Sequence, residues 1–225
     1  MTKKNIILTL TISALALILI IGGIFTANRA RKNTRSYNIS ANLTPEQRQE
    51  FESKIQSAQA IIHNPKSSLN DRFGAYLNMG INYESLGERD NEERAFIAAS
   101  ELEPTSDLPW SDLASLYVNE SRYADATRAF QKALALGKTD AQLWEKYLDF
   151  NRYQLKLDGH SLDALYNRAI EDTNGDVNVR KFYASYLEDV GNINAAISQW
   201  KAILVLDPND KAVQAEVQKL QAEAR

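Results

Sequence analysis

The sequence predicts an all-α protein in which stacked helical hairpins follow one N-terminal transmembrane helix. Three features predict this fold. Residues 6–25 form an uncharged apolar run, residues 109–136 show the pattern of two consecutive amphipathic helices, and the same pattern occurs 34 residues earlier. Between residues 178 and 207 no strand-like alternation competes with the helical periodicity. We therefore expect one folded domain made of helices behind a membrane span.

The apolar run at 6–25 is twenty residues long, enough at about 1.5 Å per residue to cross a hydrocarbon core of about 30 Å. A cleaved signal peptide is the alternative, but its apolar region usually has about 7 to 15 residues, and residues 26–30 make a poor cleavage site. We interpret 1–26 as a single-pass membrane anchor that contacts the membrane through residues 6–25. Residues 27–43 are polar and basic, which predicts a flexible tether.

Basic residues lie on both sides of this span, so the positive-inside rule alone does not orient it. They are Lys3 and Lys4 before the span and Arg29, Arg31, Lys32 and Arg35 after it. A short basic start before a long apolar run is typical of a bacterial signal-anchor, which favours an extracytoplasmic domain. The opposite orientation stays open.

A helix start is the first signal of the domain predicted at 44–225. Thr44 is a hydroxyl cap, Pro45 suits the first helical place, and Gln47 completes a capping box. The leading helix should cover 45–63, followed by a loop to Asp71. Because it lacks a full partner, we expect it to cover the exposed face of the first hairpin.

The stretch 109–136 is the clearest hairpin. Its first helix has apolar residues at i, i+3, i+4 and i+7, which are Trp110, Leu113, Ala114 and Tyr117. After a break at 119–122, the second helix repeats this spacing with Tyr123, Ala126, Phe130 and Ala133. We expect Trp110 to be a large buried ring at the centre of the stack.

These residues resemble a tetratricopeptide repeat (TPR), whose pattern is an aromatic residue, Leu-Gly, Tyr, Ala, Phe and Pro. The copy 34 residues earlier matches with Tyr76, Met79, Gly80, Tyr83, Phe96, Ala99 and Pro104. Two departures stand out. Glu92 occupies a place for a small residue, which predicts a wider helix crossing, and Lys138 replaces the final Pro, which predicts a less strictly set turn. The resemblance implies a right-handed superhelix of hairpins.

The resemblance divides the domain into four repeats and a cap. The repeats should cover about 73–106, 107–140, 141–174 and 177–210, and a capping helix should cover 211–224. The third repeat has two extra residues, which we place in a longer loop around 155–160. Such a loop is either a contact site or tolerated drift, and we favour drift because surface loops accept insertions easily.

Composition excludes several classes of function. The first 35 residues hold six of the 26 basic residues, and the rest holds all 29 acidic ones, so the domain is acidic and unsuited to nucleic acid. There is no cysteine, and His63 and His160 have no catalytic or metal-binding partner at a recognisable spacing. We expect neither catalysis nor a cofactor nor a metal.

In the TPR family, fixed places on the first helix of each hairpin line a concave groove. By that resemblance the groove contains Leu77, Asn78, Ile81, Ser111, Ser115, Asn119, Lys146, Asp149, Arg152, Lys181 and Ser185. Some members grip a C-terminal carboxylate with Lys and Asn at the places that hold Leu77 and Ile81 here, so we do not expect that clamp. The lining is apolar at first and charged from Glu145 onward, which suits an extended peptide with an apolar end and a charged end.

The sequence thus predicts a non-catalytic, membrane-anchored adaptor or scaffold that binds a protein or peptide segment in its groove. Similar single-span TPR proteins act in envelope assembly. One alternative keeps the fold but fills the groove with the protein's own chain, such as segment 45–64, giving a homo-oligomeric structural element. Another is an accessory subunit of an enzyme.

Overall fold

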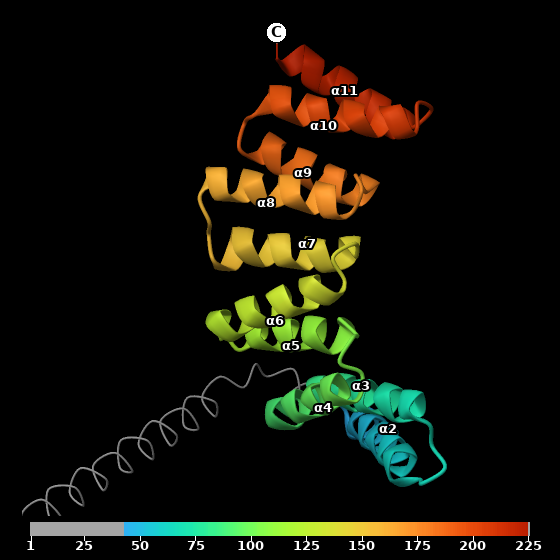
Figure 1. The fold of residues 1–225 in the computed structure, drawn as a ribbon. Coiled ribbons are helices and arrows are strands. Elements are labelled where there is room, and N and C mark those ends of the chain that lie inside the picture. Colours follow the sequence, from blue (N-terminus) through green and yellow to red (C-terminus); the bar gives the residue numbers. More distant parts are fainter. Residues whose placement is uncertain (1–42, 225) are drawn as a thin grey trace, which may run out of the picture.

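The protein is a stack of helices in a computed structural model that describes residues 43–224. Within this range every regular element is a helix. The elements are α2 (Pro45–His63), α3 (Leu69–Leu86), α4 (Arg89–Leu102), α5 (Leu108–Asn119), α6 (Tyr123–Leu136), α7 (Ala141–Asp149), the π-helix η2 (Phe150–Gln154), α8 (Gly159–Asp172), α9 (Val177–Asp189), α10 (Ile193–Leu206) and α11 (Lys211–Glu223). They follow one another along a single axis, with α2 at one end and α11 at the other (Figure 1).

Neighbouring helices pair as hairpins. Helix α3 packs on α4, α5 on α6, and α9 on α10, while α7 contacts both α8 and α9. Helix α2 packs on α3 and α11 packs on α10, so these two helices cover the ends of the stack. Segment 45–64, which the homo-oligomeric alternative places in the groove, corresponds to α2. In the structure α2 lies against the first hairpin, on α3.

Helix starts follow the local capping chemistry. The Thr44 hydroxyl accepts from the Gln47 backbone N–H at 3.2 Å, and α2 begins at the next residue, Pro45. A second capping box, with Ser68 and Asp71, begins α3 at Leu69. The first repeat thus begins before residue 73. The loop expected to reach Asp71 ends at Ser68 instead, because the capping box of Ser68 and Asp71 begins the helix there.

Trp144, not Trp110, is the large ring at the centre of the stack. Trp144 is fully buried, and its indole N–H donates to the Lys138 carbonyl at 2.8 Å. Trp110 is only partly buried and packs on the edge of the core. The turn at Lys138 is well determined without a proline, because the Trp144 ring holds it and Asp140 caps α7.

The crossing of α3 and α4 is close rather than wide. A Cβ atom added to Gly80 would lie 2.3 Å from the Phe96 ring, so only glycine lets these helices meet here. Glu92 is buried in the same hairpin and pairs with Arg89 at 2.6 Å. The long Glu92 side chain reaches this arginine, which offsets part of the cost of burying its carboxyl group.

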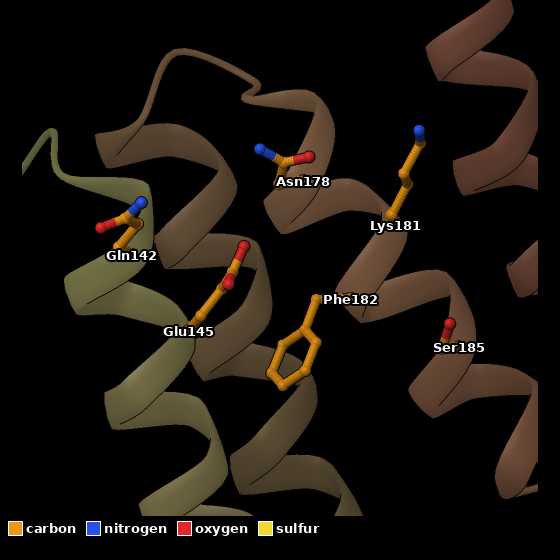
Figure 2. A pocket seen from close by; sticks show the side chains of 6 residues that line it. All are labelled: Gln142, Glu145, Asn178, Lys181, Phe182 and Ser185. Carbon is orange, nitrogen blue, oxygen red and sulfur yellow. The ribbon is translucent and has the colours of Figure 1, made fainter. Parts of the chain in front are cut away.

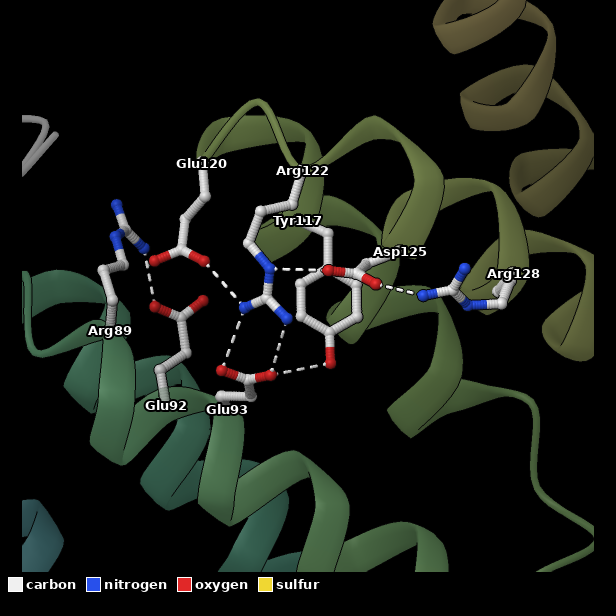
Figure 3. A network of polar contacts seen from close by, with 8 residues as sticks. All are labelled: Arg89, Glu92, Glu93, Tyr117, Glu120, Arg122, Asp125 and Arg128. Atoms are coloured by element: carbon white, nitrogen blue, oxygen red, sulfur yellow. Dashed lines mark hydrogen bonds and ion pairs between the residues drawn. The ribbon is translucent and has the colours of Figure 1, made fainter. Parts of the chain in front are cut away.

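A polar network joins the first hairpin to the second (Figure 3). The Arg122 guanidinium pairs with both oxygens of Glu93 on α4, at 3.0 and 3.1 Å. It also bonds Asp125 at 2.8 Å and lies over the Tyr117 ring at 4.2 Å. Burial raises the Tyr117 pKa, and the adjacent Glu93 carboxylate raises it further. Arg122 is thus the main polar link between these repeats.

The extra residues of the third repeat form a π-helix rather than only a longer loop. Helix α7 continues into η2, where Leu155 N–H donates to the Phe150 carbonyl, and α8 begins at Gly159. Asn151 is buried in η2 and donates to the Tyr147 carbonyl at 2.7 Å. Part of the insertion therefore lies inside a helix.

The predicted membrane span at 6–25 and nearly all of the tether at 27–43 lie outside the described residues. Among the helices from α2 to α11, none combines the length and apolar character needed to cross a bilayer.

Candidate binding groove

Within residues 43–224, two hollows lie where first helices of successive repeats meet, and both border α7. The first, the α5–α7 hollow, has a volume of about 350 Å³. Its lining is Ser115, Val118 and Asn119 from α5, Phe130 from α6, Lys146 and Asp149 from α7, and Phe150, Tyr153 and Gln154 from η2. Phe130 and Phe150 are buried and pack with ring centroids 5.3 Å apart, which gives the hollow an aromatic floor beneath polar side chains.

The π-helix shapes the rim of this hollow. Its extra residue per turn leaves Phe150 buried while Tyr153 is 55% exposed. Gln154 accepts from the Tyr123 hydroxyl at 3.1 Å, which ties η2 to α6. An exposed aromatic ring beside an aromatic floor is the kind of surface that anchors a bound protein segment.

The second, the α7–α9 hollow, has a volume of about 370 Å³ (Figure 2). Gln142 and Glu145 come from α7, and Asn178, Lys181, Phe182 and Ser185 come from α9. Burial raises the Glu145 pKa, and the neighbouring carboxylates of Asp176, Asp149 and Asp140 raise it further. This hollow thus has an aromatic ring, two amides, a hydroxyl, an ammonium and one carboxylate, and further carboxylates lie near that of Glu145.

Six of the predicted groove residues line these hollows. They are Ser115, Asn119, Lys146 and Asp149 in the first and Lys181 and Ser185 in the second. Ser111 lies beside them, nearly buried, and its hydroxyl accepts from the Lys146 ammonium at 3.3 Å. Beside Ser111, burial raises the Asp112 pKa to about 6, against the attraction of Lys146.

The other four predicted residues line neither hollow. Leu77 packs against the core, and Asn78 and Ile81 are exposed on α3. Arg152 instead connects two repeats, because its guanidinium pairs with Asp189 at 2.7 Å and lies over the Tyr186 ring at 5.1 Å. That contact leaves 16% of the Arg152 side chain exposed.

Sequence reasoning missed several residues that line the hollows. Three of them lie at places of the repeat register that line the groove in the TPR family, so the register could have predicted them. They are Gln142, Asn178 and Phe182. Phe150 and Gln154 had no such signal, because a π-helix shifts the register within a helix. The positions of Phe150 and Gln154 are set by the π-helical backbone of η2.

Comparison with known proteins identifies the type of fold. No protein-family model matches the chain, and no curated protein matches it. The solved structure of PilF from Pseudomonas aeruginosa has 21% identity and a TM-score of 0.51 over 70% of this chain and 71% of that one. The crystal structure of MamA has 16% identity and a TM-score of 0.51 over 77% of this chain and 91% of that one. Both are TPR proteins. The fold is TPR-like.

In a stack of this kind, adjacent repeats present one continuous surface. Each of the two hollows has at least one aromatic side chain in its lining. Within residues 43–224 no group of three or more acidic or histidine side chains is arranged to hold a metal ion. His63 and His160 are both exposed.

Proposed function

We propose that this protein is a non-catalytic, membrane-anchored adaptor that binds an extended segment of another protein along its two hollows. The observation that carries the proposal is their succession across α5, α7 and α9, each with an aromatic side chain among polar ones. Apolar anchors surrounded by a polar rim are the usual anatomy of a protein interface. The TPR-like fold supports the same class of function.

The cellular setting of the proposal rests on the N-terminal sequence. The uncharged run at 6–25 anchors the adaptor, and the basic start before it favours an extracytoplasmic domain. An adaptor in that position would bring its partner to the membrane, which suits assembly of the cell envelope.

Filling the α5–α7 hollow tests the binding function. Ser115 lines this hollow, so Ser115→Trp should place a large ring where the partner binds. Arg128→Trp is the matched control, since Arg128 lies on α6 outside both hollows with a 71% exposed side chain. The full-length chain, tagged and purified from its own cells, should retain a partner protein. Ser115→Trp should abolish retention while Arg128→Trp preserves it.

Two results would contradict the proposal. Equal retention by both variants would place the partner elsewhere on the molecule. Retention of nothing but further copies of the same chain would favour the homo-oligomeric structural element, whose mass depends on concentration.

A further inference from the structure

The α7–α9 hollow has a carboxylate on one wall, that of Glu145, which forms no ion pair with a cation in the described part of the chain. Glu145 projects from α7 toward α9, and Phe182 lies between the two helices (Figure 2). None of the ion pairs within residues 43–224 involves Glu145. The charges that raise the Glu145 pKa are negative and come from two helices: Asp140 and Asp149 at the two ends of α7, and Asp176 at the N-cap of α9.

Lys181 does not neutralise this carboxylate, although it lines the same hollow. Its ammonium lies 4.0 Å from the carboxylate of Asp210, the residue that caps α11. Figure 2 shows the Lys181 side chain directed away from Glu145. The side of the hollow between Glu145 and Phe182 is therefore both negative and aromatic.

We propose that this side of the α7–α9 hollow receives a Lys or Arg side chain of the bound segment. A cation there pairs with Glu145 and packs on the Phe182 ring, whose face attracts positive charge. The amides of Gln142 and Asn178 lie at one end of the hollow, within its lining, and offer hydrogen bonds to an extended backbone. The proposal deepens the proposed adaptor function and rests on it.

Other side chains fit this place less well. An acidic side chain would add a fifth negative charge to Glu145, Asp140, Asp149 and Asp176. An apolar one would cover the Glu145 carboxylate without pairing it, which costs the desolvation of a charge. The neighbouring α5–α7 hollow, with its floor of Phe130 and Phe150, suits the apolar residue of the same segment.

Retention of the partner by full-length variants tests the basic side chain. Glu145→Gln should lower retention about tenfold, because a close charge pair is lost. Lys181→Gln should raise retention, since removing this cation leaves the hollow more negative and more attractive to a basic side chain. Glu171→Gln is the matched control for the same chemical change at an exposed position outside both hollows. Since Glu145 is partly exposed, its variant should fold, which circular dichroism verifies.

The outcomes separate the two proposals. If the wild-type chain retains no partner, or if Ser115→Trp does not release it, the adaptor function fails and the basic-residue proposal fails with it. If the partner is retained and released by Ser115→Trp but is insensitive to Glu145→Gln, only the basic-residue proposal is overturned. A loss with Lys181→Gln instead would overturn it in favour of an acidic side chain.

Discussion

Trp144 is the side chain on which the middle of the stack depends most. It is fully buried, and its indole N–H holds the turn at Lys138. Trp144→Ala should lower the free energy of unfolding by about 3 to 5 kcal/mol, because it leaves a cavity and an unpaired carbonyl. Trp110→Ala should cost clearly less, since Trp110 is partly exposed. Urea denaturation checks both, and an equal or larger loss at Trp110 would contradict this assignment of the core.

Glu92 gives the stability of the protein a pH dependence. Burial raises its pKa from 4.5 to about 7, although Arg89 opposes the shift. The folded state thus binds the Glu92 proton more tightly than the unfolded state, and the stability gained from that proton is lost as the pH rises from about 4.5 to about 7. We expect the unfolding free energy of the wild type, minus that of Glu92→Gln, to fall across this range and to level off above it.

Urea denaturation of both proteins at a series of pH values measures this difference. Subtracting the two unfolding free energies at each pH removes the contributions of the other titrating groups, which both proteins share. A difference that is constant with pH, or that rises, would show that Glu92 is fully charged in the folded state and that its pair with Arg89 outweighs burial.

Individual residues also show what sequence reasoning can and cannot reach. The repeat pattern indicated that Gly80 and Phe96 belong to one hairpin, and the structure places them in contact. It favoured Trp110 over Trp144, because a position in the pattern does not reveal how much neighbouring repeats cover it. The burial of Glu92 was missed because its partner Arg89 lies outside the pattern.

Among the elements, the junction between the first two hairpins depends on Arg122. This side chain is 27% exposed and binds Glu93, Glu120 and Asp125, whereas Arg128 binds the same Asp125 from a 71% exposed position. Arg122→Ala should cost about 2 kcal/mol by removing the guanidinium that pairs with the partly buried Glu93 carboxylate. Arg128→Ala should cost less than about 0.5 kcal/mol, as exposed ion pairs usually do.

Hydrogen exchange locates the effect of Arg122→Ala. Amides in α2, α3 and α4 should lose protection before those in α8 to α10, because the substitution weakens one interface in a chain of interfaces. Uniform loss of protection along the chain would mean that the stack unfolds as one cooperative unit.

The sequence did not predict that residues 150–154 form a π-helix, η2. It presents Tyr153 at the α5–α7 hollow. Tyr153→Ala should change the unfolding free energy by less than about 0.5 kcal/mol, since the ring is exposed, yet reduce retention of the partner at least about tenfold. Val205→Ala, at an 80% exposed position outside both hollows, is the control and should change neither. Unchanged retention by Tyr153→Ala would remove η2 from the binding surface.

The helices themselves were largely predictable because their signals are local. Capping residues and apolar spacing indicate where α2, α5 and α6 lie. The start of α3 and the form of η2 were not predicted. The start of α3 is marked by the capping box of Ser68 and Asp71, which the repeat pattern does not include. The form of η2 depends on how the two extra residues of the third repeat are distributed between a helix and a loop.

At the scale of the whole molecule, the two hollows lie in the middle of the stack rather than at its ends. The two hollows belong to α5, α7 and α9, whereas α2 and α11 cover the terminal hairpins. The repeat register predicted which helices line a groove. It did not predict that Leu77, Asn78 and Ile81 lie outside both hollows, because a hollow depends on side-chain size and helix spacing between neighbouring repeats.

The central claim is that another protein binds along these hollows. Photocrosslinking in cells tests it most directly, with a probe at Ser115 in the α5–α7 hollow and the same probe at Arg128 as the control. We expect one specific adduct with a different protein from position 115 and none from position 128. Adducts with the same chain only, or equal adducts from both positions, would contradict the claim.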